Sequence, residues 1–76
     1  MRKPMNWAAE LYLGRDRSTA LALGPKRFRS AANAIRFAIQ RAAPVSLRGA
    51  MLVVGQHEFG PSEIARFHRA LAASNT

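Results

Sequence analysis

Residues 30–44 read SAANAIRFAIQRAAP, and the other elements of the chain are best understood around this segment. Ser30 is a favourable helix N-cap, the alanine-rich run after it has high helix propensity, and Pro44 stops a helix. At 100° per residue, one arc of this helix is apolar and the opposite arc is polar. The apolar arc consists of Ala31, Ala34, Ile35, Ala38, Ile39 and Ala42, and the polar arc of Asn33, Arg36, Gln40 and Arg41. Because most of these inner side chains are small, we expect the helix, Ala31 to Ala43, to lie close against a β-sheet.

Two segments before this helix show the alternation of half-buried strands. In Trp7–Leu13, and again in Thr19–Leu23, every second side chain falls on one apolar face. Residues 14–18, GRDRS, have the composition of a turn. The sequence therefore predicts an antiparallel hairpin that ends at Gly24 and Pro25.

The chain after the helix predicts a second hairpin and a second helix. Residues 50–54, AMLVV, are apolar on both faces, which is typical of a central strand. Gly55 and Gln56 can form a two-residue turn into a short strand over residues 57–59. A last helix is expected from Pro61 or Ser62 to about Ala73.

Together these elements give the order ββαββα. We expect an α+β fold with a three- or four-stranded antiparallel sheet and two helices packed on one face. Residues 6–74 are predicted to form a single domain, and residues 1–5 a disordered basic tail.

The composition excludes several classes of protein. The 76 residues include no cysteine, which rules out disulfides, thiol nucleophiles and thiolate metal sites. No apolar run approaches the roughly 18 residues of a membrane span. Pro4, Asn6 and Glu10 interrupt what could be the apolar region of a signal peptide. We therefore expect a cytoplasmic protein with no membrane association.

The charge is distinctive in both size and placement. The formal net charge is +8 at pH 7. No acidic residue lies between Ser18 and Arg48, whereas the arginines and glutamates of residues 49–76 balance. Such segregation indicates a basic surface that attracts nucleic acid or another polyanion.

The candidate binding residues surround the start and the polar arc of the helix that begins after Ser30. They are Lys26, Arg27, Arg29, Ser30, Arg36 and Arg41. A helix N-terminus carries partial positive charge, so cations crowded there are unfavourable and a bound anion would relieve them. The backbone N–H groups of Ala32 and Asn33 would add donors. The alternative is a solvated loop, because a misplaced exposed charge costs only about 0.3–1 kcal/mol.

Phe37 lies in the middle of the polar arc, among arginine and amide side chains. One interpretation is a platform on which nucleic-acid bases stack beside phosphate-binding arginines. A second is the centre of a dimer or partner interface, where phenylalanine and arginine are enriched. A third is simple cover by another segment of the chain.

Neither catalysis nor metal binding is supported by the sequence. The four carboxylates are dispersed, no G-x-S-x-G elbow is present, and His57 and His68 match no metal-ligand spacing. His68 falls on the inner stripe of the last helix, where we expect a structural histidine with a backbone partner. We predict no catalytic residue, no metal site and no cofactor, and we do not expect an enzyme.

Three segments carry a resemblance to a known family: residues 28–39, FRSAANAIRFAI; residues 48–54, RGAMLVV; and the turn of residues 55–59, GQHEF. Over about residues 10–72 the chain resembles a family of small uncharacterised bacterial proteins. The resemblance implies a compact α+β fold. It supplies no functional residues, because the family carries no assigned activity.

The sequence thus favours a small non-catalytic binding protein. The most specific hypothesis is binding of a polyanion, RNA or DNA, through the basic surface. The alternative is a protein–protein interaction or homodimerisation module with no nucleic-acid role. A third hypothesis is a site for a small anionic molecule beside Ser30.

Overall fold

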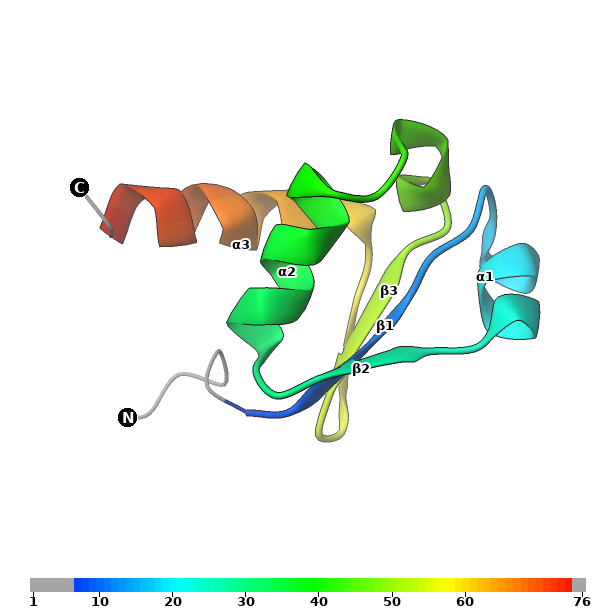
Figure 1. Cartoon of the computed structure of the whole chain (residues 1–76), viewed down its shortest axis with the longest axis horizontal. Helices are drawn as coiled ribbons and strands as arrows, with labels where there is room; N and C mark the ends of the chain where they lie inside the picture. Colours follow the sequence, from blue (N-terminus) through cyan, green and yellow to red (C-terminus); the bar gives the residue numbers. More distant parts are fainter. Residues whose placement is uncertain (1–6, 75–76) are drawn as a thin grey trace.

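The computed structural model describes residues 7–74, so the tail predicted for residues 1–5 lies outside the described residues. In chain order its elements are β1 (Ala9–Tyr12), α1 (Arg17–Leu23), β2 (Lys26–Phe28), α2 (Ala31–Gln40), the 3-10 helix η2 (Pro44–Leu47), β3 (Met51–Val54), β4 (His57–Phe59) and α3 (Pro61–Ser74) (Figure 1). The four strands form one antiparallel sheet in the order β2-β1-β3-β4. The α+β class is confirmed, whereas the predicted order ββαββα is wrong.

The sheet has one buried face, set by the strand register. Leu11 of β1 lies opposite Leu52 of β3, and Leu52 lies opposite Phe59 of β4. Side chains of successive strand residues point to opposite faces, so this row shares a face with Ala9 and Val54. Leu11 and Leu52 are fully buried, which places the core on this side of the sheet.

Helices α2 and α3 supply the other half of the core. Ala31, Ala34, Ile35 and Ala38 of α2 are buried, as the arc of small side chains predicts. Ile64 of α3 joins the same cluster. Figure 1 shows α2 lying across the sheet next to the start of α3. The outer face of α2 is therefore left to solvent.

The main correction concerns Thr19–Leu23, predicted as a strand but helical in the structure. Asp16 caps this helix, because its Oδ1 accepts a hydrogen bond from the Thr19 N–H at 2.8 Å. Gly24 ends it with a φ of 85°, and its N–H donates to the carbonyl of Ala20. Capping residues at both ends thus override a short alternating pattern.

Burial in α1 is the reverse of what the alternation predicted. The small Ala20 is buried, whereas Leu21 and Leu23 are 48% and 72% exposed. The buried alanine lies against Gly14, where an added Cβ would come within 2.5 Å of the Ala20 nitrogen. Close backbone packing, which periodicity does not report, selects the face that α1 buries.

A second close approach involves Gly49, just before β3. Its N–H donates to the Gly14 carbonyl at 2.8 Å, and a Cβ on Gly49 would overlap the backbone of Asp16. Only a residue without a side chain fits there. Gly14 and Gly49 therefore join the segment before α1 to the segment before β3.

Helix α1 occupies the segment predicted as the second strand. The second strand, β2, lies later in the chain, at Lys26–Phe28. This strand pairs with β1 and forms an edge of the sheet. Lys26 and Arg27 thus belong to a strand, and only Arg29 and Ser30 lie at the start of α2. Within residues 7–74, no helix is long and apolar enough to cross a lipid bilayer.

Candidate functional site

Helix α2 follows strand β2 after a short turn and packs against it. The chain turns at Arg29 and Ser30, so the middle of α2 returns over the strand that precedes it. The rings of Phe28 and Phe37 meet with their centroids 5.5 Å apart and their planes tilted by 49°. Both rings are half-buried, and Phe37 is therefore partly covered by β2.

A shallow depression of about 250 Å³ opens beside these two rings. Its lining consists of Phe28, Asn33, Arg36, Phe37, Gln40 and Arg41. All except Phe28 come from the polar arc of α2 that the sequence analysis identified. The depression thus combines two aromatic rings, two guanidinium groups and two amides.

Lys26 completes this group from the strand. Its Nζ lies 5.7 Å from the centroid of the Phe37 ring, in a cation–π arrangement. We call the surface formed by Lys26, Phe28, Arg29 and the outer face of α2 from Asn33 to Arg41 the α2–β2 surface. An exposed cation–π contact contributes only about 0.5–1 kcal/mol. The ammonium can therefore leave the ring for a stronger partner.

Arg27 does not belong to this group. Successive strand residues point to opposite faces, so Arg27 projects away from α2. It lies opposite Glu10 in the register, and its Nε is 3.3 Å from the Glu10 Oε2. The structure thus separates Arg27 from Lys26, although the sequence analysis treated them as one cluster.

Arg29 and Ser30 occupy the turn into α2. Arg29 is exposed, and within residues 7–74 it forms no ion pair with a carboxylate. The Ser30 Oγ accepts a hydrogen bond from the Asn33 N–H at 3.1 Å, which makes it the predicted N-cap. The hydroxyl therefore already serves the helix.

The N-terminus of α2 has fewer donors for an anion than the sequence analysis assumed. Of the two expected donors, the Asn33 N–H is engaged by Ser30. The Ala31 N–H also has a partner, the Trp7 carbonyl at 2.7 Å. A polar group that is already paired gains little from a ligand. The outer face of α2 is thus a better candidate for the site than its first turn.

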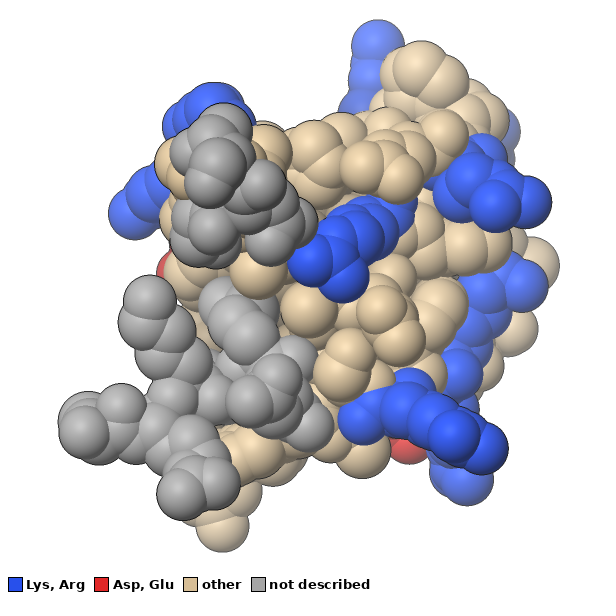
Figure 2. Space-filling model, turned by 60° about the vertical axis from the view of Figure 1, so that its left-hand side comes forward, with Lys and Arg blue, Asp and Glu red and all other residues tan. Residues whose placement is uncertain are grey.

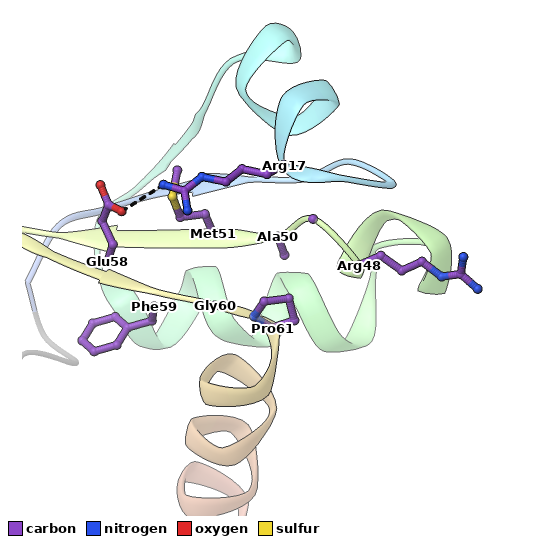
Figure 3. Close-up of a pocket in the computed structure, with 9 residues that line it drawn as sticks. Arg17, Arg48, Ala50, Met51, Glu58, Phe59, Gly60 and Pro61 are labelled. Atoms are coloured by element: carbon purple, nitrogen blue, oxygen red, sulfur yellow. Dashed lines mark hydrogen bonds and ion pairs between the residues drawn. The ribbon is translucent and has the colours of Figure 1, made fainter.

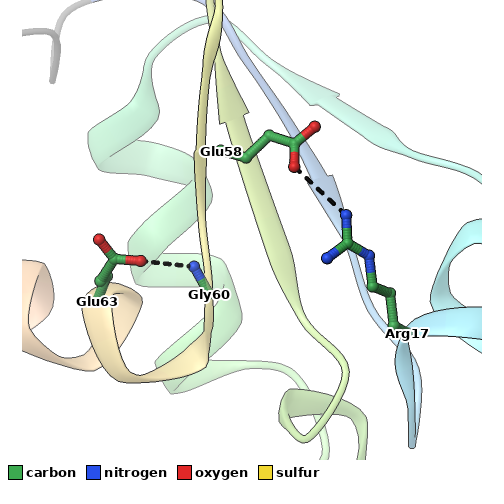
Figure 4. A network of polar contacts seen from close by, with 4 residues as sticks. All are labelled: Arg17, Glu58, Gly60 and Glu63. Carbon is green, nitrogen blue, oxygen red and sulfur yellow. Dashed lines mark hydrogen bonds and ion pairs between the residues drawn. The ribbon is translucent and has the colours of Figure 1, made fainter.

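The carboxylates of the described residues are engaged elsewhere. Glu58 lies 3.4 Å from Arg17, and the Glu63 Oε1 accepts from the Gly60 N–H at 3.0 Å (Figure 4). Asp16 lies 3.8 Å from Arg15, and Glu10 pairs with Arg27 as described above. The hydrogen bond from the Thr19 N–H lowers the pKa of Asp16 below its ordinary value of 3.8.

All four basic side chains of the α2–β2 surface consequently lack an acidic partner among residues 7–74. Within residues 7–74, Lys26, Arg29, Arg36 and Arg41 form no ion pair. Figure 2 shows basic side chains recurring across one face of the molecule, with acidic atoms visible only at its edges. The opposite face of the sheet differs, because it carries the pairs of Glu10 with Arg27 and Glu58 with Arg17.

A second hollow, of about 230 Å³, lies beside β4 and the start of α3. Figure 3 shows the Arg17 guanidinium facing Glu58 there, while Arg48 points away from the hollow. The rest of its lining is mostly backbone and apolar side chains, with Met51 and Pro61 among them. Arg17 and Glu58 are engaged with each other, whereas Arg48, the third charged residue of the lining, has no ion-pair partner among residues 7–74. The two charged groups that face the hollow are therefore already paired.

The two histidines lie apart. His57 is exposed on β4, whereas His68 of α3 is half-buried. The Gln40 amide nitrogen lies 3.3 Å from the His68 Nε2, so the partner of His68 is a side chain, not the backbone group we expected. Within residues 7–74, no group of three or more histidine, aspartate or glutamate side chains could hold a metal ion.

Phe28 is the site residue that the sequence analysis missed. The alternation of Thr19–Leu23 predicts the strand too early in the chain, whereas the structure has it at Lys26–Phe28. Pro25 carries a signal that could have found it, since proline restricts the preceding residue and favours an extended or turning chain. An apolar residue in a run of cations at a sheet edge is then expected to face the core.

Comparisons of the chain with protein-family models, with curated proteins and with solved structures found no match. The function is therefore argued from the α2–β2 surface alone.

Proposed function

We propose that this chain is a non-catalytic binding protein for a polyanion, RNA or DNA, and that the α2–β2 surface is its binding site. The observation that carries the proposal is the pairing of charges. The carboxylates of the described residues are engaged by other groups, and Lys26, Arg29, Arg36 and Arg41 form no ion pair among residues 7–74. A phosphate backbone supplies the missing negative charges.

Nucleic acid suits this surface better than a single small anion does. The cations come from a strand, a turn and a helix, so several separate elements can each contribute a phosphate contact. Each phosphate that a cation neutralises releases a counterion, and several weak contacts add up along a chain of phosphates. The aromatic and amide groups between the cations match the chemistry of bases.

The proposal predicts a strong dependence on salt. If the four cations each neutralise one phosphate of a single strand, the log–log slope of affinity against salt is about −3. The affinity then falls about 50-fold between roughly 50 and 200 mM monovalent salt. Fluorescence anisotropy with a labelled single-stranded oligonucleotide and with a duplex measures both the affinity and the slope.

Matched charge-reversal variants test whether the binding site lies on the α2–β2 surface. Arg41 and Arg48 are both exposed, and neither has a carboxylate partner among the described residues. Only Arg41 lines the depression beside Phe37. Arg41→Glu is expected to weaken binding at least about 10-fold and to reduce the slope by about 1, while Arg48→Glu changes the affinity less than about 3-fold. Equal effects of the two variants, or no binding at about 50 mM salt, would overturn the proposal.

A second candidate function, a protein–protein or homodimer contact, is favoured by a different surface. Leu21, Leu23 and Val45 are exposed, and no strand among residues 7–74 pairs with the outer edge of β2. Sedimentation at high micromolar concentration tests self-association. A monomer there would argue against a homodimer, and Leu23→Asp should dissociate a dimer that uses the exposed leucines.

A further inference from the structure

We infer that the depression beside Phe28 and Phe37 holds an unpaired base, so that the ligand is single-stranded nucleic acid. The inference rests on the proposed function and narrows it. Its basis is the composition of the lining, which combines two aromatic rings and two amides with the two guanidinium groups.

A duplex presents mainly phosphates and sugars to a protein surface, and cations alone can bind it. The α2–β2 surface offers more than cations, since Phe28, Phe37, Asn33 and Gln40 line the depression together. Aromatic rings gain little from a phosphate backbone, and amides can bind either a phosphate or the edge of a base. An unpaired base offers both an aromatic face and a hydrogen-bonding edge. The lining is thus complementary to a base between two phosphates.

The spacing along α2 fits this assignment. Asn33 precedes Phe37 by about one helical turn and Gln40 follows it by slightly less than one, so both amides share a face of the helix with the ring. The Gln40 amide nitrogen is already held by His68 of α3 at 3.3 Å. This contact orients the amide of Gln40 before any ligand arrives, and its carbonyl oxygen can accept from an N–H group of a base, such as the N3–H of thymine.

The size of the depression limits what it can hold. At about 250 Å³ it is smaller than the pockets of roughly 300–1,000 Å³ that enclose drug-sized ligands. It suits one base lying against the rings better than a whole nucleotide enclosed by protein. The sugar and phosphates would then lie outside, where Lys26, Arg36 and Arg41 can reach them.

Comparison with an abasic oligonucleotide separates the contribution of the bases to the affinity from that of the phosphates. The probes are a dodecamer of thymidine and an abasic dodecamer with the same number of phosphates, each titrated at about 50 mM salt. We expect the thymidine dodecamer to bind the unmodified protein about 10-fold more tightly, because only it can stack. A duplex of the same length should bind no more tightly than the abasic strand does.

Two variants locate the effect. In Phe37→Leu, which keeps an apolar side chain against Phe28, the preference for the thymidine dodecamer over the abasic one should fall to below about 3-fold. Asn33→Ala alters an exposed side chain of the same lining and should lower the preference without a change in melting temperature. It keeps the test valid if Phe37→Leu fails to fold.

The outcomes distinguish a failure of the base site from a failure of the proposed polyanion binding. Equal affinity for the thymidine and abasic dodecamers would refute the base site and leave phosphate binding intact. A preference that persists in both variants would refute its location. Absence of binding to either dodecamer would refute the proposed function itself.

Discussion

The ring centroids of Phe28 and Phe37 lie 5.5 Å apart, although one residue belongs to an edge strand and the other to the middle of a helix. This contact fixes α2 over β2. It also brings cations from both elements onto one surface, because Lys26 precedes Phe28 by two residues and Arg36 and Arg41 flank Phe37 on the helix. The same pair of rings thus serves both the fold and the candidate site.

A double-mutant cycle should detect this contact. We expect Phe28→Leu and Phe37→Leu each to lower the free energy of unfolding, since both remove half-buried aromatic area. The coupling energy between them should be about 0.5–1.5 kcal/mol, the range for aromatic pairs. Denaturant unfolding of the four proteins measures it. Strict additivity of the two single effects would show that the rings do not stabilise each other.

Two adjacent strand residues offer a sharp test of the site. Lys26 faces Phe37, whereas Arg27 points to the other side of the sheet and pairs with Glu10. We predict that Lys26→Ala weakens binding of a single-stranded oligonucleotide about 3- to 10-fold, because one phosphate contact is lost. Arg27→Ala should leave the affinity within about 2-fold. Fluorescence anisotropy at low salt measures the affinities of the two variants. A larger loss of affinity in Arg27→Ala than in Lys26→Ala would contradict the α2–β2 surface and indicate a site on the other face of the sheet.

Gly49 should be the least replaceable of the glycines for a structural reason. A Cβ there would overlap the backbone of Asp16, which cannot move without disturbing the start of α1. Gly49→Ala is expected to lower the free energy of unfolding by about 2 kcal/mol or more, as overpacking does. The matched control is Gly60→Ala, since nothing lies within 4 Å of a Cβ built at Gly60. Its effect should stay below about 1 kcal/mol. Similar thermal denaturation of the two variants would contradict the close approach.

Local signals explain which parts of the fold could be predicted. Ser30, the alanine-rich run and the position of Pro44 lie within one short segment. They correctly predict the N-cap of α2 and the burial of Ala31, Ala34, Ile35 and Ala38. Ile39 is only half-buried, and Ala42 lies beyond the end of α2. The turn at Gly55 and the start of α3 at Pro61 are likewise specified by residues within the turn or the first turn of the helix. α2 ends at Gln40, earlier than predicted, and the chain enters the 3-10 helix at Pro44.

The prediction failed at Thr19–Leu23 because five residues can satisfy a strand pattern and a helix pattern equally. Two contacts resolve the ambiguity. Asp16 caps the helix through a local hydrogen bond from Thr19, and Gly14 lets Ala20 approach closely. Because the strand is predicted at Thr19–Leu23, the prediction does not include Phe28 in a strand. The polar arc of α2 was predictable from helical geometry, whereas the contact of Phe37 with Lys26 required the position of β2.

Acid should weaken the cap of α1. The Thr19 N–H holds the pKa of Asp16 below its ordinary value of 3.8, so the carboxylate form is favoured in the folded protein. A lowered pKa stabilises the fold above the unfolded-state value, and this contribution is lost as the pH falls through the folded-state value. Asp16→Asn keeps a cap without a charge, and its melting temperature should therefore fall less than that of the parent between about pH 5 and about pH 2. Parallel pH profiles of the two proteins would show that the Asp16 charge has no role.

The most direct test of the central claim is to map the ligand on the protein by ¹⁵N–¹H NMR during titration with a thymidine dodecamer. Binding at the α2–β2 surface predicts the largest shift changes at Lys26, Phe28 and along α2 from Asn33 to Arg41, with little change at His57–Phe59. Changes concentrated at β4 and the hollow beside Arg17, or none at saturating oligonucleotide, would contradict it.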